Sequence, residues 1–312
     1  MKKIFIDGSA GTTGLRIAER LESRKDIELI KLSEENRKDI AARKEAINLA
    51  DIAFLCLPDA AAMESVSLIE NPDVKVLDTS TAHRTNPAWA YGFPELDKDF
   101  YEKIKTSNRI AVPGCHASGF IALVRPLVQA GLLSPDSKLT ATSLTGYSGG
   151  GKKMIADYES ENKSVLLGAP RQYGLSQAHK HLKEMKAITG ISEAPIFCPI
   201  VADFYSGMEV TVPLFAKDLQ KGGIEEIKEV YKKYYNTEIV KYEEDDEDDE
   251  FFEVECPSCH EDVLIDFDIL DDEKGIVCQT HAGLVALDMQ GKVQHRVPME
   301  ELLAPKEIYL AR

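Results

Sequence analysis

The residue types that could carry covalent chemistry gather around one thiol, Cys115, within Ala-Val-Pro-Gly-Cys-His-Ala-Ser-Gly at 111–119. Pro113 and Gly114 would form a tight turn that places this thiol at the start of an apolar helical segment. The free N–H groups and the positive dipole end of a helix stabilise a thiolate at that position. A cysteine without this context is more often a small buried residue. We therefore predict that Cys115 is a catalytic nucleophile for acyl chemistry.

A nucleophilic thiol needs an acid or base nearby, and the sequence His-Lys-His at 179–181 offers two. Residues two positions apart do not share a helical face, which argues against a helical zinc pair. We predict that His181 is the acid/base, and His179 remains the alternative. Glu184 would either orient an imidazole or lie in solvent.

Two further segments could bind anions. The glycine-rich stretch 145–153 contains Ser148 and Gly149, and the backbone N–H groups of such a loop can hold a phosphate or carboxylate. The spacing is not that of a Walker motif, and a flexible loop is the alternative. Arg84 follows a predicted strand, whose end should line a ligand crevice. We predict Ser148, Gly149 and Arg84 as substrate-binding residues.

The elements that would position these residues begin with a strand, a glycine-rich turn and a helix in residues 3–21. The glycines recur as Gly-x-x-Gly-x-x-Gly, which lets the backbone turn tightly and approach a pyrophosphate at the helix N-terminus. In this context the pattern indicates dinucleotide binding. The predicted cofactor-binding residues of the turn are Gly8, Gly11, Thr12, Thr13 and Gly14.

The residues after the second predicted strand, 28–32, favour NADP over NAD. An acidic residue at the end of this strand usually binds a free ribose 2′-hydroxyl, whereas a serine and a nearby arginine suit a 2′-phosphate. Here Ser33 and Arg37 provide the second arrangement, although Glu34 lies between them. Charges on a helix surface are the alternative explanation.

Strands alternate with helices through the first part of the chain, which predicts an α/β fold with a Rossmann-type doubly wound parallel sheet. Apolar runs at 50–57 and 74–77 read as buried strands of this sheet. Strands at 138–144, 195–201 and 209–214, with a helix at 224–235, indicate a second, α+β substrate domain. We expect an NADP-binding domain at 1–114 and a catalytic domain at 115–242.

Charge is distributed very unevenly along the 312 residues. The net charge is −16, and residues 243–312 contain 21 acidic and 5 basic residues, so residues 1–242 are neutral overall. Such a tail would be repelled by nucleic acid. Apolar runs are too short for a membrane span or a signal peptide. We expect a cytoplasmic protein that binds neither membranes nor nucleic acids, with cysteines that are reduced or metal-bound.

The tail itself divides into an acidic linker at 243–255 and a zinc-ribbon-like module at 256–312. Its pattern is Cys-x2-Cys-x18-Cys-x2-His, which predicts tetrahedral structural zinc bound by Cys256, Cys259, Cys278 and His281. The segment 263–269 between the two pairs looks like a strand. Metal would stabilise a unit too small to build its own core. Reduced cysteines in a hairpin are the alternative.

Several segments of 1–242 together resemble the N-acetyl-γ-glutamyl-phosphate reductases of the shorter type. They are residues 5–15, 55–59, 78–84, 89–95, 113–115, 146–152, 179–181 and 207–214. The resemblance implies an NADPH-dependent enzyme of arginine biosynthesis that acts on a small acyl phosphate. Cys115 would form a thioester, which hydride from NADPH would reduce, and a histidine would assist release of the aldehyde. Members usually form dimers or tetramers, so a homo-oligomer is implied.

After residue 242 we expect this resemblance to end, because the acidic run replaces the segment with which the family completes its substrate domain. Weaker NADPH binding and reduced turnover would follow. Two alternatives to the reductase remain. One is the related group of semialdehyde dehydrogenases that act on aspartyl phosphate. The other is a catalytically impaired, reductase-like scaffold whose acidic zinc tail binds a protein partner.

Overall fold

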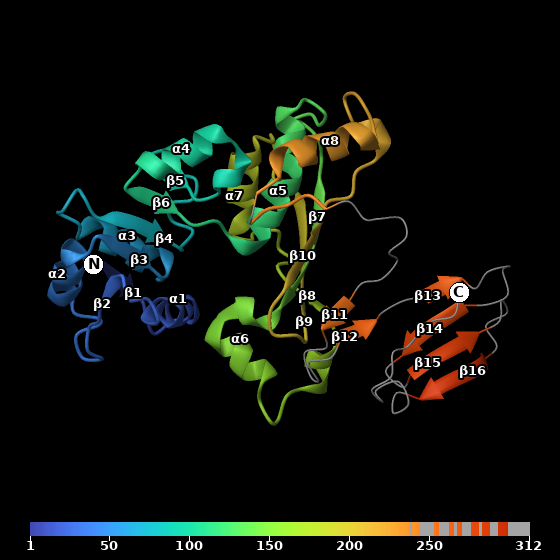
Figure 1. The fold of residues 1–312 in the computed structure, drawn as a ribbon, viewed down its shortest axis with the longest axis horizontal. Helices are drawn as coiled ribbons and strands as arrows, with labels where there is room; N and C mark the ends of the chain where they lie inside the picture. Colours follow the sequence, from blue (N-terminus) through green and yellow to red (C-terminus); the bar gives the residue numbers. More distant parts are fainter. Residues whose placement is uncertain are drawn as a thin grey trace. The chain divides into compact units, whose positions relative to one another are not determined.

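The computed structural model describes residues 1–237 and 239–243, together with the backbone of six strands between 253 and 298 (Figure 1). The chain forms two compact units, Met1–Tyr242 and Glu243–Arg312. Each is described here by itself. Three of the predicted zinc ligands, Cys256, Cys259 and His281, lie outside the described residues.

The first unit begins with a six-stranded sheet in the order β2-β1-β3-β4-β6-β5. Every neighbouring pair of strands is parallel, which confirms the predicted Rossmann-type sheet. Its strands are β1 (Lys2–Asp7), β2 (Ile27–Ile30), β3 (Ile52–Leu55), β4 (Lys75–Asp78), β5 (Ala90–Tyr91) and β6 (Arg109–Ala111). β2 ends at Ile30, earlier than predicted, where its pairing with Phe5 of β1 ends.

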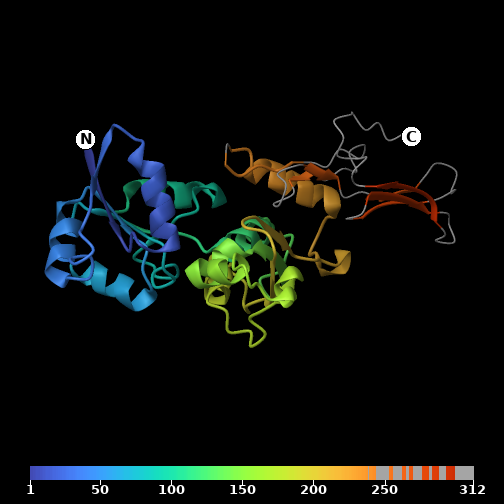
Figure 2. The same cartoon turned by 90° about the horizontal axis from the view of Figure 1, so that it is seen from below.

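Four helices connect these strands: α1 (Thr12–Glu22), α2 (Ile40–Leu49), α3 (Asp59–Ser67) and α4 (Lys98–Thr106). α1 lies on one face of the sheet, and α2 and α3 lie on the other (Figure 2). The chain runs outward from β1 to β2 and then returns to place β3 on the other side of β1. This reversal creates a topological switch point between β1 and β3, where such folds bind ligands.

A second, mixed sheet has the order β10-β7-β9-β8. Its strands are β7 (Thr140–Gly146), β8 (Arg171–Gln172), β9 (Ile196–Ala202) and β10 (Met208–Thr211). β7 and β9 are parallel, whereas β10 and β8 pair antiparallel at the two edges. The helices of this part are α5 (Cys115–Gln129), α6 (Gly151–Tyr158), α7 (His181–Thr189) and α8 (Ile224–Tyr234).

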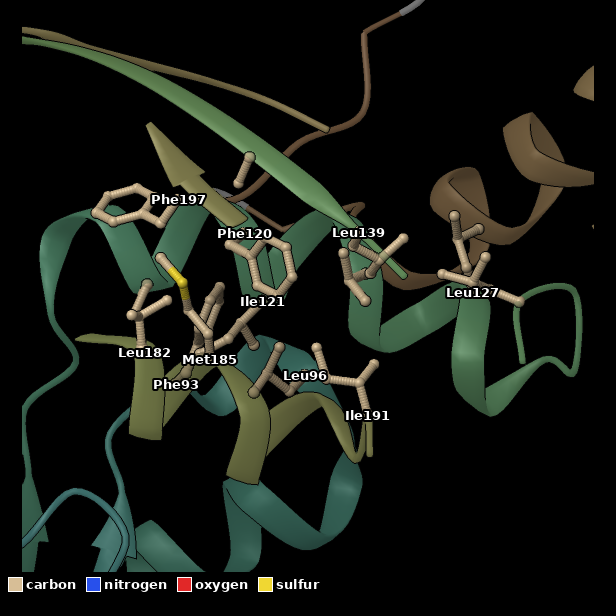
Figure 3. Packing of buried hydrophobic residues seen from close by; sticks show 14 of the residues in the cluster. Phe93, Leu96, Phe120, Ile121, Leu127, Leu139, Leu182, Met185, Ile191 and Phe197 are labelled. Atoms are coloured by element: carbon tan, nitrogen blue, oxygen red, sulfur yellow. The ribbon is translucent and has the colours of Figure 1, made fainter. Parts of the chain in front are cut away.

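The largest core of the unit joins α5 and α7 to this second sheet (Figure 3). Phe120 and Ile121 of α5, Met185 of α7 and Phe197 of β9 are almost completely buried. Gly119 lets α5 approach the sheet closely, because a Cβ at this position would collide with the side chain of Val210. The core therefore fixes the direction of α5, the helix that begins with Cys115.

Residues along β9 alternate between the two faces of the second sheet. Phe197 and Val201 are buried on the core side, whereas Ile196 is 60% exposed. Cys198, which shares the face of Ile196, is of intermediate exposure. The face away from the helices therefore presents apolar side chains to its surroundings.

In the second unit, β11 (Glu253–Glu255) and β12 (Asp262–Leu264) form an antiparallel pair. A four-stranded antiparallel sheet contains β13 (Phe267–Ile269), β14 (Ile276–Thr280), β15 (Gly283–Leu287) and β16 (Val293–Pro298). The single strand expected at 263–269 is wrong, because the segment contributes β12 to one sheet and β13 to the other. Cys278 lies in β14.

Candidate active site

Cys115 is the first residue of α5, and it is exposed. The chain reaches it from β6 through Val112, whose N–H donates to the backbone oxygen of Asp78 at 2.8 Å. The N-cap residue, Gly114, provides no side-chain cap for the helix. The thiol therefore faces free backbone N–H groups and the positive end of the α5 dipole, which is the environment that stabilises a thiolate.

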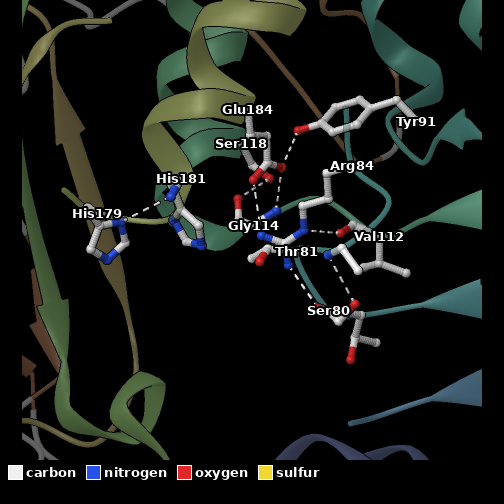
Figure 4. A network of polar contacts seen from close by, with 12 residues as sticks. Ser80, Thr81, Arg84, Tyr91, Val112, Gly114, Ser118, His179, His181 and Glu184 are labelled. Carbon is white, nitrogen blue, oxygen red and sulfur yellow. Dashed lines mark hydrogen bonds and ion pairs between the residues drawn. The ribbon is translucent and has the colours of Figure 1, made fainter. Parts of the chain in front are cut away.

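The carboxylate of Glu184 lies directly beneath this turn (Figure 4). One oxygen accepts the backbone N–H of Gly114 at 2.7 Å and the hydroxyl of Tyr91 at 2.6 Å. The other accepts Nη1 of Arg84 at 3.0 Å. Glu184 is only 2% exposed. Neither role expected for Glu184 fits these contacts, since it is not in solvent and it binds the turn rather than an imidazole.

Arg84 also differs from its predicted role as a ligand for the substrate anion. Its Nε donates to the carbonyl of Val112 and its Nη2 to the carbonyl of Thr79, both at 2.9 Å. With Nη1 on Glu184, each nitrogen of the guanidinium has a protein acceptor. The side chain is buried as well, because it joins the loop after β4 to α7. The structure thus makes Arg84 a support of the nucleophile turn.

Burial and the charge of Glu184 raise the pKa of Tyr91, so its hydroxyl keeps its proton and donates to the carboxylate.

The loop that carries Arg84 is also fixed by contacts of the neighbouring residue His83. Asp78 accepts Nδ1 of His83 at 2.6 Å, and the His83 ring stacks on Trp89 with centroids 4.0 Å apart. His83 thus fixes this loop through Asp78 and Trp89.

His181, the predicted acid/base, is the first residue of α7 and is 4% exposed. A Cβ on Gly114 would collide with its imidazole, which places the ring against the nucleophile turn. Burial lowers the pKa of His181 to about 2, so the ring is neutral. Its Nδ1 is buried without a hydrogen-bond partner among the described residues.

His179 is more accessible than His181. Its Nδ1 accepts the backbone N–H of His181 at 3.3 Å, as the dashed line in Figure 4 shows. Burial lowers the pKa of His179 too, so it is a neutral imidazole with its proton on Nε2. That Nε2–H is a donor available to a reacting group. The two rings lie with centroids 4.7 Å apart.

Sequence reasoning missed His116 and Tyr173. His116 directly follows Cys115 and packs among the same imidazoles, with centroids 5.6 Å from His181 and 5.7 Å from His179. Its Nε2 lies 2.8 Å from the hydroxyl of Tyr173. The position beside the nucleophile was the available signal for His116, whereas nothing in the sequence links Tyr173 to it.

The residues predicted to bind the cofactor form one tight turn, in which the N–H of Gly11 donates to the carbonyl of Gly8 at 3.0 Å. Gly8 has φ +86°, and a Cβ there would collide with the carbonyl of Cys56 at the end of β3. A Cβ on Gly14 would collide with the carbonyl of Gly8. Thr12 and Thr13 form the first turn of α1, whose N-terminus has no side-chain cap. The backbone N–H groups there are free to bind a phosphate.

A cavity of about 530 Å³ adjoins this turn, and its lining includes Gly8, Ser9, Leu32, Glu34, Arg37 and Lys38. Nε of Arg37 lies 2.7 Å from a carboxylate oxygen of Glu34, and both side chains are exposed. Ser33 does not line the cavity. Its hydroxyl instead accepts a hydrogen bond from the backbone N–H of Asn36. The lining also includes Lys31, which pairs with Glu22, and Arg43, which pairs with Asp7 and Glu64.

The second glycine-rich segment approaches the first. A Cβ on Gly151 would lie 4.0 Å from Oγ1 of Thr12. Nη2 of Arg16 in α1 donates to the hydroxyl of Tyr205 at 3.0 Å. Ser148 and Gly149 lie in the short 3-10 helix Tyr147–Gly150 that precedes α6. These contacts bring the predicted substrate loop beside the predicted pyrophosphate turn.

Among the described residues, histidine, cysteine and acidic side chains do not group in a way that could hold a metal ion. Within the same residues, no helix combines the length and apolar character needed to cross a bilayer.

Comparison with known families identifies both parts of the chain. Residues 3–104 match the semialdehyde dehydrogenase NAD binding domain, and residues 115–276 match the semialdehyde dehydrogenase dimerisation domain. The second match extends past residue 242, so the expected end of the resemblance is too early for this family model. The fold is similar to aspartate semialdehyde dehydrogenase II of Vibrio cholerae, with a TM-score of 0.52, 15% identity, and coverage of 75% of this chain and 79% of that one.

Curated relatives are much more similar in sequence. A protein of Chelativorans sp. (strain BNC1), named N-acetyl-gamma-glutamyl-phosphate reductase, is 52% identical over 212 residues, which are 68% of each chain. A protein of the same name from Sinorhizobium medicae (strain WSM419) is 46% identical over 78% of this chain and 80% of its own length. The chain therefore belongs to the N-acetyl-gamma-glutamyl-phosphate reductase family.

Proposed function

We propose that this protein catalyses the NADPH-dependent reductive dephosphorylation of N-acetyl-glutamyl 5-phosphate to N-acetylglutamate 5-semialdehyde, a step of arginine biosynthesis. The observation that carries the proposal is the exposed Cys115 at the N-terminus of α5, which Glu184 supports from beneath. The names of the relatives support this substrate over aspartyl phosphate. The similar aspartate enzyme shares the fold at only 15% identity.

The reaction begins when the Cys115 thiolate attacks the acyl carbon. A C–S bond forms, the bond between the acyl carbon and the phosphate oxygen breaks, and inorganic phosphate leaves with the electron pair. The thioester on Cys115 would then take up a hydride, the chemistry that bound NADPH supplies, and become a thiohemiacetal oxyanion. Breaking the C–S bond then returns the thiolate and releases the aldehyde.

The structure leads us to assign the acid/base role to His179 rather than to His181. The His179 ring lies 5.7 Å, centroid to centroid, from that of His116, the residue after Cys115, and its Nε2–H is a donor that can stabilise the developing charge on the substrate oxygen. His181 is buried against Gly114, where it shapes the turn. Comparing His179→Asn with His181→Asn tests this assignment, because only the first should lower kcat with unchanged thermal stability.

For the cofactor, we propose that the pyrophosphate binds over Gly8, Gly11 and Gly14 at the start of α1. Without side chains, Gly8 and Gly14 can pack against the carbonyls of Cys56 and Gly8, and this tight turn leads to the uncapped start of α1 at Thr12 and Thr13. The ribose 2′-phosphate would meet Arg37. Ser33 keeps its predicted place in this set only if its hydroxyl turns toward the cavity.

For the substrate, we propose that the loop around Ser148 and Gly149 binds the phosphoryl group through its backbone N–H groups. This loop lies next to Thr12, so the phosphate would leave close to where the cofactor binds. We leave Arg84 out of this binding, because it is buried and each nitrogen of its guanidinium already has a protein acceptor.

The deciding experiment is NADP⁺ reduction by the purified chain with N-acetylglutamate 5-semialdehyde and inorganic phosphate. Cys115→Ser should abolish the reaction, and the matched control Cys198→Ser should retain it. Aspartate 4-semialdehyde in the same assay distinguishes the two substrate classes. A folded protein that is inactive with both substrates would favour the alternative of a reductase-like scaffold.

We further propose that the chain forms a homo-oligomer through the open face of the second sheet. The matched family model is described as a dimerisation domain, and Ile196 lies 60% exposed on that face. Light scattering should give at least a dimer mass for the natural chain. Ile196→Lys should shift the mass toward the monomer, whereas the exposed-site control Leu175→Lys should not. The cytoplasmic location remains a prediction.

The zinc site also remains a proposal, and the spacing of its residues is what supports it. Of the four predicted ligands, Cys278 lies in β14, and Cys256, Cys259 and His281 are outside the described residues. Metal analysis should find one zinc per chain and none after Cys256→Ser. A protein partner for this acidic tail is a prediction that pull-down with and without chelator would test.

A further inference from the structure

A buried chain of hydrogen bonds lies directly behind the nucleophile. Ser143 of β7 donates its hydroxyl to the carbonyl of Glu209 at 3.1 Å. The same oxygen lies 2.7 Å from Nδ1 of His116. Nε2 of His116 lies 2.8 Å from the hydroxyl of Tyr173. Ser143 is fully buried and His116 is 4% exposed, so water does not compete for these contacts.

The protons of this chain can be assigned by counting donors. The single hydrogen of Ser143 goes to Glu209, so its oxygen must accept from Nδ1–H of His116. Burial lowers the pKa of His116 to about 4, which leaves a neutral ring with one N–H. Its Nε2 is then an acceptor, and the Tyr173 hydroxyl donates its only hydrogen to it. The free lone pairs of Tyr173 can only accept.

The Tyr173 hydroxyl is also placed near the reacting thiol. The backbone N–H of Tyr173 donates to the carbonyl of Pro199 at 3.0 Å, which fixes the residue against β9. The pKa of Tyr173 is raised to about 12, mainly by burial and to a smaller extent by the charge of Cys115. The hydroxyl is held by His116, the residue directly after Cys115. An acceptor-only hydroxyl is thus one side chain away from the nucleophile position.

We propose that Tyr173 is a specificity-determining residue whose hydroxyl oxygen accepts the N–H of the substrate's acylamino group, with His116 as the positioning residue that sets this polarity. The inference rests on the proposed function. An ionised N-acyl glutamyl phosphate carries carboxylate, phosphate and carbonyl oxygens, all of which accept. Its amide N–H is the donor that an acceptor-only group can bind.

The test uses two substrates that differ at that donor. One is N-acetylglutamate 5-semialdehyde, and the other is its ester analogue, in which oxygen replaces the amide N–H. The natural enzyme should prefer the amide by about tenfold in kcat/KM, the size expected of one hydrogen bond. Tyr173→Phe should lose about tenfold on the amide through KM and nothing on the ester. An equal loss on both substrates would overturn the proposal.

His116→Asn tests the positioning role through the same amide-to-ester ratio, which a purely structural effect would leave unchanged. The ratio should fall in His116→Asn and fall no further in the double variant with Tyr173→Phe. Tyr235→Phe is the matched control, because that buried hydroxyl binds the carbonyl of Ala122. It should keep the natural ratio.

A second readout separates this inference from the proposed function. If the natural chain turns over neither substrate, the proposed function has failed, and binding can still be measured by protection of Cys115 from alkylation. N-acetylglutamate should then protect about tenfold better than its ester analogue, and Tyr173→Phe should remove the difference. Equal protection by the two compounds in the natural chain would refute the role of Tyr173.

Discussion

The carboxylate of Glu184 accepts the backbone N–H of Gly114 at 2.7 Å, one residue before the exposed Cys115. This contact joins α7 to the N-terminus of α5, and Arg84 extends it to the loop after β4. The thiol is thus held indirectly, through the backbone that precedes it. A group that never touches substrate can therefore control the position of the nucleophile.

Glu184→Gln should destabilise the protein and slow the reaction. The substitution leaves Arg84 as a buried charge without its partner, which costs about 3–5 kcal/mol in comparable sites. Denaturant unfolding measures the loss. The matched control is Glu193→Gln, because the Glu193–Lys138 pair is exposed and its loss should change stability little. A Glu184 variant as stable as the control would contradict this account.

Gly8→Ala should abolish cofactor binding. The position has φ +86°, and the added Cβ would collide with the carbonyl of Cys56, so the turn would have to open. Fluorescence titration with NADPH should show at least a tenfold weaker affinity, or about 1.4 kcal/mol. Gly168→Ala is the control, since a Cβ there meets nothing within 4 Å. Unchanged binding in Gly8→Ala would remove the turn from the cofactor site.

Arg37→Ala should reduce the preference for NADPH over NADH. Arg37 lines the cavity beside the dinucleotide turn, and a 2′-phosphate would compete with Glu34 for its guanidinium. We expect about tenfold weaker NADPH binding with unchanged NADH binding, as for one charged hydrogen bond. Glu34→Gln should act in the opposite direction. Equal losses for both cofactors would point to a general effect on the cavity.

The buried histidines should make the protein sensitive to acid. Burial lowers the pKa of His116 to about 4 and of His181 to about 2, below the ordinary value in an unfolded chain. The unfolded state therefore binds more protons as pH falls below about 6.5. Each histidine should then remove about 1.4 kcal/mol of stability per pH unit, down to its folded pKa.

Denaturant unfolding at pH 7.5, 6 and 5 measures this dependence. His116→Asn should flatten the slope below pH 6.5, because one of the two neutral imidazoles is gone. An identical slope in the variant would show that His116 takes up its proton in the folded protein as readily as in the unfolded chain.

The parts of the site that sequence could predict are those encoded locally. Local sequence determines the turn at Gly8, Gly11 and Gly14 and the helix start at Cys115. Their sequence patterns therefore predict both features. Arg84 and Glu184 are separated by 100 positions, and only the packing of α7 against the nucleotide sheet brings them together. A charged residue on a helix or after a strand gives no sign of such a partner. The sequence therefore predicts a substrate ligand at Arg84 and either an imidazole partner or a solvated acid at Glu184.

The same limit applies to the histidines. The exposure of each ring in the motif at 179–181 depends on where α7 begins relative to Gly114, which the sequence pattern does not encode. His181 lies at the first position of that helix and faces inward, whereas His179 precedes it. In the second unit, the boundary between β12 and β13 depends on which strand each half pairs with, which an apolar run does not encode.

The Arg84–Glu184 pair also bears on how the first unit unfolds. One partner belongs to the parallel sheet and the other to the helix layer of the mixed sheet. If one sheet unfolded alone, the partner charge in the other would remain buried without its counter-ion. Forms with only one sheet folded are therefore disfavoured. Heat or denaturant should then unfold both sheets in one cooperative transition. The turn that carries Cys115 should then lose its structure only when both sheets unfold.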